Sequence, residues 1–293
     1  MEYSPEYSTI GGQNKMKDYC ILLRIKHYVK NLIIFIPMFF GGVLFDMNRF
    51  INGVVGFVAF SMAASAVYVF NDLLDVEKDR NHPVKKDRPL ASGKITKKRA
   101  VLCILLCLLI CFMSLQYMGS KSATSLIVFY VLINIAYSLG LKNVPILDIV
   151  ILSLGFIIRL FLGGVVTDVV ISKWLFLVVM TGSFYMGLGK RRNELKRHTE
   201  TRKVLRFYTD SFLDKNMYVC VALANVFYAL WASEILNTKV IWTVPVFIVI
   251  LMRYSLVIEG NSEGDPVDVI AKDYVLQGMT LIYSVFIFML LYF

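Results

Sequence analysis

Charged residues are scarce in this sequence, and long stretches of it have none. Lys, Arg, Asp and Glu make up 18% of the 293 residues, whereas 57% are hydrophobic. In soluble globular domains, about one-quarter of the residues are charged and about half are apolar. The composition therefore disfavours a soluble domain. The uncharged stretches cover residues 31–45, 50–71, 100–120, 122–141, 149–158, 174–189, 216–233, 240–252 and 274–293.

The length of these stretches indicates helices that cross a membrane. A helix needs about 20 mainly apolar residues to span the hydrocarbon core of a bilayer, and several of the stretches reach that length. We expect the shorter ones, such as 31–45 and 240–252, to be extended by flanking residues or to run obliquely. The sequence therefore predicts an all-α, multi-pass membrane protein with nine transmembrane helices, one for each stretch.

Cysteine is also scarce, with five residues in the chain. Cys103, Cys107 and Cys111 lie one helical turn apart on one face of a predicted span. No histidine or carboxylate accompanies them, so packing between helices is favoured over a ligand site. Cys20 and Cys220 have no evident partner, and the sequence predicts no disulfide.

Positive charges alternate between the two sides of the predicted spans. Five Lys or Arg residues precede the first span, nine follow the second and nine follow the sixth. The intervening loops carry one each, namely Arg49, Lys121, Lys173 and Lys239. The positive-inside rule then places the N-terminus and both charged loops in the cytoplasm. Residues 1–30 lack the pattern of a cleaved leader, and we expect them to be a cytoplasmic tail before one transmembrane domain, 31–293.

Acidic residues recur at a regular spacing directly after the second predicted span. In "NDLLDVEKD", Asp72, Asp75 and Asp79 lie at offsets 0, 3 and 7, so a helix that continues from the span would place all three on one face. Their mutual repulsion favours a cation between them, and carboxylates are ligands that Mg²⁺ prefers. Asn71 could add an amide oxygen. A metal–diphosphate site is favoured over a solvated loop with scattered charge.

Cations and prolines follow in the segment "HPVKKDRPLASG". Lys85 and Arg88 are three residues apart, and the two prolines predict a stiff path that is not helical. Cations beside a metal-bound diphosphate stabilise a departing pyrophosphate. We therefore expect Lys85 and Arg88 to bind the leaving group, with His82 as a further candidate for substrate binding.

A second charged segment, "GKRRNELKRH", follows the sixth predicted span. Lys190, Arg191 and Glu194 fall within one sector of a helix. Glu194 could bind a second Mg²⁺ or orient a cation, and Arg191 could hold a phosphate through a bidentate fork. An ordinary ion pair on a solvated helix face is an equally good interpretation of this segment alone.

Polar residues also lie at and after the fourth predicted span. The segment "AYSLGLKNVPILD" is expected to bring Tyr137, Lys142 and Asp148 to the side of the charged loops. Arg159 lies about three turns into the fifth span, where an ionised side chain is costly in lipid. We expect it to face a polar cavity and a carboxylate or phosphate.

These motifs resemble the UbiA superfamily of intramembrane prenyltransferases. "NDLLDVEKD" is similar to the superfamily signature NDxxDxxxD, and the resemblance covers nearly the whole chain. "DRNHPVKKDRPLASG", "YSLGLK", "GFIIRLFLGGV", "SKWLFL", "GKRRNEL" and "EGDPVDVIAKD" resemble its branch of decaprenyl-phosphate phosphoribosyltransferases. Quinone-pathway members usually carry an acidic second motif, where this chain has Lys190, Arg191 and Glu194.

The resemblance implies a UbiA-like helical bundle with a catalytic site at the cytoplasmic face of the plasma membrane. It implies Mg²⁺-dependent transfer of 5-phosphoribosyl from phosphoribosyl pyrophosphate to a polyprenyl phosphate in the lipid bilayer. No nucleic acid is expected as a partner, and homo-oligomerisation is left open. The expected metal ligands are Asp72, Asp75, Asp79 and Glu194, with Lys190 as a further catalytic residue. The expected substrate-binding residues are Lys26, Lys30, Asn71, His82, Lys85, Arg88, Tyr137, Lys142, Arg159, Lys190 and Arg191.

Two other functions are weighed against this one. A UbiA-type enzyme could move a prenyl group from a prenyl diphosphate to an aromatic or other small acceptor, and the basic second motif disfavours it. A transporter would place ionisable groups near the middle of the bilayer. Here Arg159 is the one charged residue that is clearly deep in a predicted span.

Overall fold

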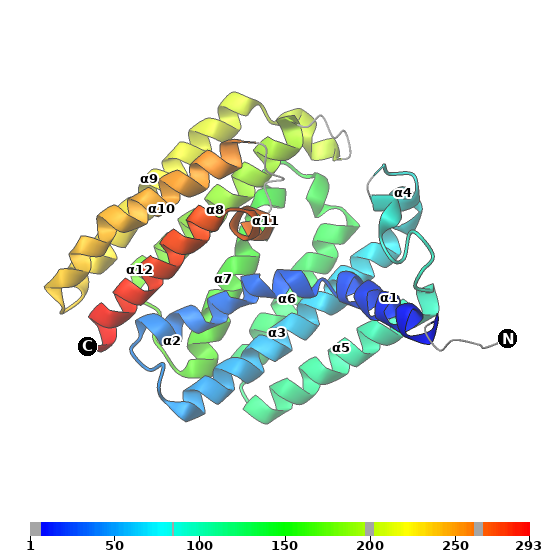
Figure 1. The fold of residues 1–293 in the computed structure, drawn as a ribbon, viewed down its shortest axis with the longest axis horizontal. Coiled ribbons are helices and arrows are strands. Elements are labelled where there is room, and N and C mark those ends of the chain that lie inside the picture. The colour runs from blue at the N-terminus through cyan, green and yellow to red at the C-terminus, as the bar shows by residue number, and fades with distance from the viewer. Residues whose placement is uncertain (1–6, 84, 197–201, 261–265) are drawn as a thin grey trace. The chain divides into compact units, whose positions relative to one another are not determined.

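The structure is a computed structural model that describes residues 7–83, 85–196, 202–260 and 266–293. Every regular element within these ranges is a helix (Figure 1). The α-helices are α1 (Tyr7–Leu22), α2 (Ile36–Phe40), α3 (Met47–Leu74), α4 (Val76–Arg80), α5 (Lys97–Met118), α6 (Lys121–Leu139), α7 (Leu147–Thr167), α8 (Lys173–Lys196), α9 (Asp210–Glu234), α10 (Thr243–Glu259), α11 (Pro266–Lys272) and α12 (Tyr274–Tyr292). The 3₁₀ helices are η1 (Ile25–Phe35), η2 (Lys85–Asp87), η3 (Leu141–Asn143), η4 (Lys203–Phe207) and η5 (Thr238–Trp242).

Hydropathy and helix length identify membrane-spanning candidates among these elements. In the described part of the chain, seven helices are long and apolar enough to cross a membrane. They are Met47–Leu74, Lys97–Met118, Lys121–Leu139, Leu147–Thr167, Asp210–Glu234, Thr238–Glu259 and Tyr274–Tyr292. The other two predicted spans are not among these seven helices. Residues 31–40 of the span 31–45 are divided between η1 and α2, and 174–189 lies within α8. The all-helical membrane class is confirmed, and the count of nine spans remains a prediction.

Local sequence explains where several helices begin and end. Thr96 and Thr209 precede α5 and α9, and each hydroxyl accepts a hydrogen bond from the backbone N–H three residues later. Asp273 caps α12 in the same way. These side chains satisfy N–H groups that the first helical turn leaves free. Gly119 ends α5 at φ 60°, a left-handed conformation that glycine adopts without a steric penalty.

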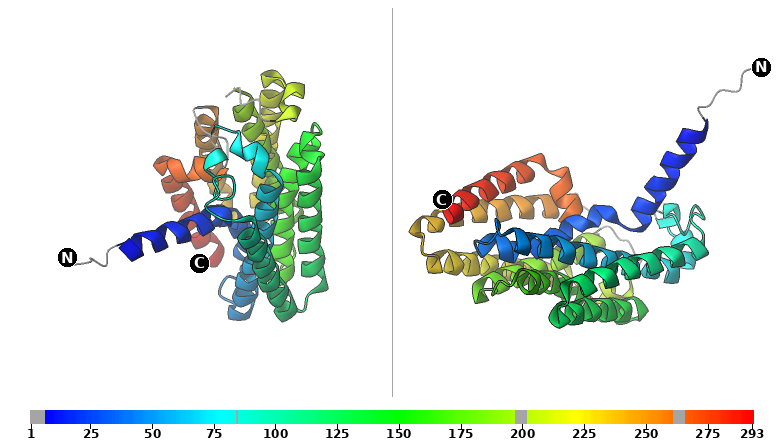
Figure 2. Two further views of the ribbon diagram at one scale, coloured as in Figure 1. Left: turned by 90° about the vertical axis from the view of Figure 1, so that its right-hand side faces the viewer. Right: turned by 90° about the horizontal axis from the view of Figure 1, so that it is seen from below.

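The chain divides into two compact units, and the first comprises residues 1–32 and 54–135. Within it, α5 extends along α3 (Figures 1 and 2), and the rings of Phe60 on α3 and Tyr130 on α6 have centroids 4.4 Å apart. A buried apolar cluster joins the end of α1 to α3, α4, the segment after α4 and the start of α5. It contains Leu22, Val69, Val76, Leu90, Ile95 and Ala100. This packing holds the Asp-rich segment against α1.

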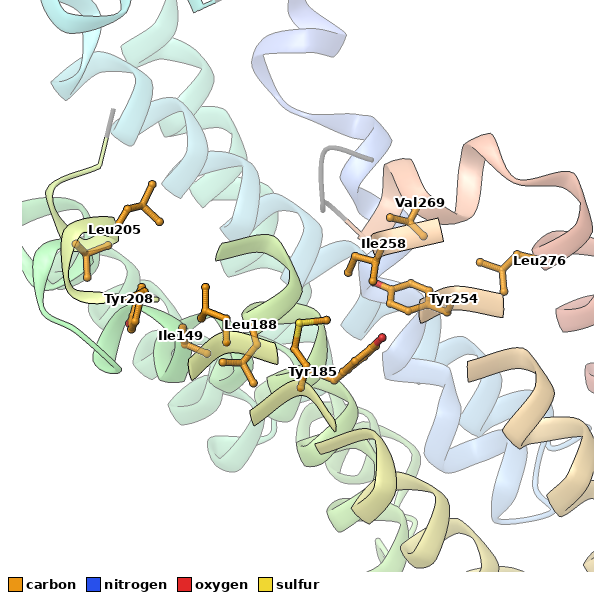
Figure 3. Close-up of a cluster of buried hydrophobic side chains, with 12 residues drawn as sticks. Ile149, Tyr185, Leu188, Leu205, Tyr208, Tyr254, Ile258, Val269 and Leu276 are labelled. Carbon is orange, nitrogen blue, oxygen red and sulfur yellow. The ribbon is translucent and has the colours of Figure 1, made fainter. Parts of the chain in front are cut away.

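The second unit comprises residues 33–53 and 136–293. Here α8 packs along α7 and α9, and α10 packs against α9 and α12 (Figures 1 and 2). Figure 3 shows the buried side chains that join α7, α8, η4 and α10–α12, among them Ile149, Leu188, Tyr208 and Ile258. Gly163 of α7 lies so close to Ile34 that a Cβ atom would be 2.1 Å from the Ile34 carbonyl oxygen. Small residues allow such close backbone contacts between membrane helices.

Candidate active site

The Asp-rich segment lies in the first unit, where α3 gives way to α4. α3 ends at Leu74 and α4 begins at Val76, so the predicted continuous helix is interrupted at Asp75. Helical hydrogen bonding nevertheless continues across the break, from Asp75 N to Asn71 O at 3.0 Å and from Asp79 N to Asp75 O at 2.8 Å. The seven-residue separation therefore still places Asp79 on the same side of the helical segment as Asp72. Both carboxylates are nearly buried, with side chains 5% and 6% exposed.

Two arginines hold these carboxylates. Arg88 Nη1 donates to Asp72 Oδ1 at 3.1 Å and to Asp79 Oδ2 at 2.7 Å, so it bridges the pair. Arg24 Nη2 donates to Asp72 Oδ1 at 2.7 Å. We call Asp72, Asp79, Arg24 and Arg88 the Asp-rich cluster. Asp75 takes a different partner, because its carboxylate lies 4.0 Å from the Lys78 ammonium.

The donor set of this cluster fits a hard divalent cation. Asp72 and Asp79 each direct a carboxylate oxygen at the same guanidinium nitrogen, and Mg²⁺ takes oxygen ligands of this kind. Within the described ranges, however, no three His, Cys, Asp or Glu side chains converge as they would around a metal ion. Asp72 and Asp79 take hydrogen bonds from Arg24 and Arg88 in place of a metal ion. Asp75 lies against Lys78, so the expected grouping of three carboxylates is not formed.

The segment after α4 positions the remaining candidates of the first unit. Lys85 begins η2, so this segment has a short 3₁₀ helix where the prolines predicted an irregular path. Lys85 N donates to His82 Nδ1 at 3.2 Å. Desolvation and the nearby Lys85 ammonium lower the pKa of His82 below its ordinary value. Lys26 and Lys30 lie on η1, with Lys26 exposed and Lys30 half-buried.

The second charged segment is helical as predicted over residues 189–196, but its central arginine is not on a solvated face. Arg191 lies near the end of α8 and its side chain is 0% exposed. It donates from Nε to Asp148 Oδ2 at 2.5 Å, from Nη1 to Glu194 Oε2 at 2.7 Å and from Nη2 to the Tyr137 hydroxyl at 3.1 Å. Three protein acceptors therefore occupy three of the five N–H donors of this guanidinium.

Two further side chains complete this network. The Tyr208 hydroxyl donates to Asp148 Oδ1 at 2.5 Å and accepts from Ile146 N at 2.7 Å. Arg202 donates to the Tyr137 hydroxyl at 2.8 Å, and its Nε lies 3.4 Å from Glu194 Oε2. We call Tyr137, Asp148, Arg191, Glu194, Arg202 and Tyr208 the Arg191 cluster. It lies entirely within the second unit.

Electrostatics in the Arg191 cluster acts in opposite directions on the pKa values of Glu194 and Tyr208. Burial acts to raise the pKa of Glu194, but Arg191, Arg202 and Lys190 outweigh it and the net shift is downward. Burial and the hydrogen bond to Asp148 raise the pKa of the Tyr208 hydroxyl, which therefore stays protonated. The cluster thus combines a carboxylate that stays ionised well into acid with a tyrosine that remains a donor.

Three other predicted residues lie in the second unit. Lys190 is half-buried on α8, one residue before Arg191, and Lys142 is half-buried on η3. Arg159 is buried on α7, where its Nη1 donates to the Gly155 carbonyl of the same helix at 2.7 Å. Its guanidinium carbon also lies 5.7 Å from the centre of the Phe156 ring. Of the predicted residues in this unit, the structure brings Tyr137, Asp148 and Glu194 together through their hydrogen bonds to Arg191.

Arg24, Arg202 and Tyr208 were not selected from the sequence. Arg24 is 48 residues from Asp72, and Tyr208 is 60 residues from Asp148. No helical or strand period reaches across such separations. The available signal was weak: Arg24 belongs to the basic run before the first predicted span, where Lys26 and Lys30 were named as substrate-binding candidates and Arg24 was not.

Known proteins of similar sequence were found over most of the chain. It is 33% identical over 271 residues to a decaprenyl-phosphate phosphoribosyltransferase of Mycobacterium tuberculosis, covering 88% of this chain and 89% of that protein. It is 32% identical to proteins of the same name from Mycolicibacterium smegmatis and Corynebacterium glutamicum. These alignments cover 87% and 92% of this chain, and 86% and 85% of the relatives.

Solved structures agree on the fold. A UbiA homolog from Archaeoglobus fulgidus, bound to DMAPP and Mg²⁺, superposes with a TM-score of 0.70 and 16% identity. The superposition covers 94% of this chain and 98% of that one. The sequence model of the UbiA prenyltransferase family matches residues 33–266. Because the family model and the relatives both match most of the chain, the protein belongs to the UbiA prenyltransferase family.

Proposed function

We propose that this protein is a polyprenyl-phosphate phosphoribosyltransferase. It transfers 5-phosphoribosyl from phosphoribosyl pyrophosphate to a polyprenyl phosphate and releases pyrophosphate. The observation that carries this proposal is the shared name of the relatives, decaprenyl-phosphate phosphoribosyltransferase, at 32–33% identity over 87–92% of the chain. The second charged segment supports it, because a donor with an additional phosphate needs more cation and less carboxylate than a prenyl diphosphate.

We propose that the first unit binds the pyrophosphate end of the donor. Asp72 and Asp79, with Asn71, would hold Mg²⁺, which when bound neutralises charge on the pyrophosphate. Asp75 would join them as a ligand by turning away from Lys78. Arg88 would then exchange its carboxylates for a phosphate, as its partly exposed side chain allows. Lys85 and His82 lie in the same segment and would add contacts to the leaving group. Lys26 and Lys30 are proposed as further phosphate contacts.

We propose that the Arg191 cluster and its neighbours form a phosphate-binding region of the second unit. Lys190 and Lys142 would contribute phosphate contacts, and Arg159 a buried positive charge. Arg191 orients Glu194 and Tyr137 through the hydrogen bonds described above. Glu194 would then accept a hydrogen bond from a ribose hydroxyl or bind a second metal ion. Direct phosphate binding by Arg191 would use the two N–H donors that its three acceptors do not occupy.

The proposed reaction is a substitution at C1 of the ribose. The bond between C1 and the pyrophosphate oxygen breaks, and the pyrophosphate leaves with the electron pair. An oxygen of the lipid phosphate forms the new bond to C1 from the opposite face. No general base is needed, because a phosphate monoester is already ionised at neutral pH. Holding both reactants in place would supply much of the acceleration.

The membrane arrangement is proposed on the basis of charge and hydropathy. Residues 31–293 would form one catalytic domain of nine spans, with 1–30 as a tail and both charged loops in the cytoplasm of a plasma-membrane protein. The seven apolar helices and the 24-residue α8 support this arrangement. The polyprenyl chain would lie among the apolar helices, with its phosphate at the cytoplasmic side.

One assay tests the reaction. The purified protein is incubated with Mg²⁺, labelled phosphoribosyl pyrophosphate and a polyprenyl phosphate, and the lipid fraction is counted. A parallel reaction contains a labelled prenyl diphosphate and an aromatic acid. Label in the polyprenyl phosphate supports the proposal, whereas label transferred only to the aromatic acid would favour the prenyltransferase alternative. Asp72→Ala should lower the rate of transfer about 10²–10³-fold, and Asp87→Ala, which removes an exposed acid in the same loop, should not.

A further inference from the structure

Arg24 connects α1 to η1 in a backbone conformation that residues with side chains seldom adopt. Its φ is 54°, in the left-handed region where a Cβ atom crowds the backbone and glycine is the usual residue. Surrounding contacts must hold an arginine in such a conformation. Strained positions of this kind often carry a side chain with a role in function.

The chain around Arg24 is attached to one face of α3. The Ser65 hydroxyl donates to the Leu23 carbonyl at 2.8 Å, which fixes the backbone directly before Arg24. The guanidinium carbon of Arg24 lies 4.6 Å from the centre of the Tyr68 ring, within range of a cation–π interaction. Positions 65, 68 and 72 lie on the same face of a helix. These two contacts therefore direct the guanidinium toward Asp72.

Arg24 and Arg88 differ in the number of carboxylates that each contacts. Arg88 Nη1 divides its contacts between Asp72 at 3.1 Å and Asp79 at 2.7 Å. Arg24 Nη2 donates at 2.7 Å to Asp72 alone among the described carboxylates. Both arginines contact Oδ1, so neither contact uses Oδ2 of Asp72. Arg24 is therefore the dedicated partner of this carboxylate.

We infer that Arg24 is a positioning residue for Asp72. It holds Oδ1 and thereby fixes the carboxylate with Oδ2 available to a divalent metal ion, while Arg88 can exchange its carboxylates for a phosphate. This inference rests on the proposed role of Asp72 as a metal ligand. It assigns a function to the junction of α1 and η1, which joins the N-terminal segment to the Asp-rich cluster.

Metal binding by the full-length protein in detergent tests the inference without reference to activity. Free Mn²⁺ is measured by electron paramagnetic resonance during titration of wild type and variants. Loss of a residue that orients a metal ligand typically weakens metal affinity about 10–100-fold, and we expect this for Arg24→Gln. Arg24→Gly should show the same loss, although glycine suits the backbone at this position. Arg24→Lys should recover part of the affinity, because it restores the charge without the guanidinium fork.

Two controls separate this inference from the proposed function. Arg99→Gln removes an exposed cation from the same unit and should leave Mn²⁺ affinity unchanged. Asp72→Asn should lose Mn²⁺ binding, and an unchanged affinity would overturn both the metal role of Asp72 and the inference. If Asp72→Asn loses binding but Arg24→Gln and Arg24→Gly bind as tightly as wild type, or more tightly, only the inference is overturned. The expected Mn²⁺ pattern without phosphoribosyl transfer would support the inference and overturn the proposed reaction.

Discussion

The Asp-rich cluster and the Arg191 cluster both pair arginines with carboxylates, but Arg191 is far more buried than either arginine of the Asp-rich cluster. Arg24 and Arg88 have side chains that are 23% and 29% exposed, whereas Arg191 and Asp148 are both 0% exposed. A partly exposed guanidinium can leave its carboxylate for water or a phosphate at small cost. A fully buried one cannot leave without stranding a charge. We conclude that Arg88 of the Asp-rich cluster can exchange partners, whereas Arg191 holds the shape of its own cluster.

Removal of Arg191 should have the largest effect on stability. Arg191→Ala leaves Asp148 buried without its guanidinium, and breaking a buried pair costs about 3–5 kcal/mol. The free energy of unfolding is measured by denaturant titration in mixed micelles. Arg88→Ala is the matched variant of the Asp-rich cluster, and it should cost less, about 1.5–3 kcal/mol for hydrogen bonds to charged groups. Equal losses in the two variants would break the comparison.

Removal of a carboxylate from the Asp-rich cluster should instead affect turnover. Asp72→Ala and Asp79→Ala should each lower kcat about 10²–10³-fold, the usual cost of losing one preorganised electrostatic contact. The free energy of unfolding should change much less, because both arginines are partly exposed and water can replace the lost carboxylate. Initial rates are measured over a range of Mg²⁺ concentrations. Activity that persists in EDTA, or near-normal rates in both variants, would contradict a metal role for this cluster.

The sequence predicted which residues of each cluster are neighbours on one helix better than it predicted contacts between distant segments. Helical periodicity correctly placed Asp79 on the side of Asp72, and it correctly made Arg191 and Glu194 neighbours on α8. Uncharged stretches predicted the membrane helices because lipid forces backbone hydrogen bonds inside each segment. The break at Asp75 was not predicted, because no Gly or Pro marks it. Arg24 and Tyr208 reach their carboxylates only through tertiary packing, which local patterns do not encode.

Tyr208 offers an intermediate test of rigidity in the Arg191 cluster. Its hydroxyl joins Asp148 to the backbone N–H of Ile146, a residue with φ 70° at the start of α7. A β-branched residue rarely adopts such a conformation, so this hydrogen bond stabilises a strained turn. Tyr208→Phe should lower the free energy of unfolding by about 1.5–3 kcal/mol. Tyr218→Phe, an exposed tyrosine on α9, should have little effect and serves as the control. A loss no larger than that of the control would mean that packing alone holds the turn.

The smallest expected effect is the pH dependence that Glu194 adds. Arg191, Arg202 and Lys190 lower its pKa below the ordinary value of 4.5 despite burial. The unfolded chain therefore binds a proton before the folded one does, and the stabilisation from Glu194 is present above pH 4.5 and lost as the pH falls through the folded-state pKa. Glu194→Gln removes the titrating group, so its free energy of unfolding should decline less than that of wild type between neutral pH and about pH 3.5. Glu77→Gln changes a carboxylate that is 72% exposed and should keep the wild-type slope. If Glu194→Gln also kept that slope, the arginines would not be holding Glu194 ionised, and the Arg191 cluster would rest on the pair of Arg191 and Asp148 alone.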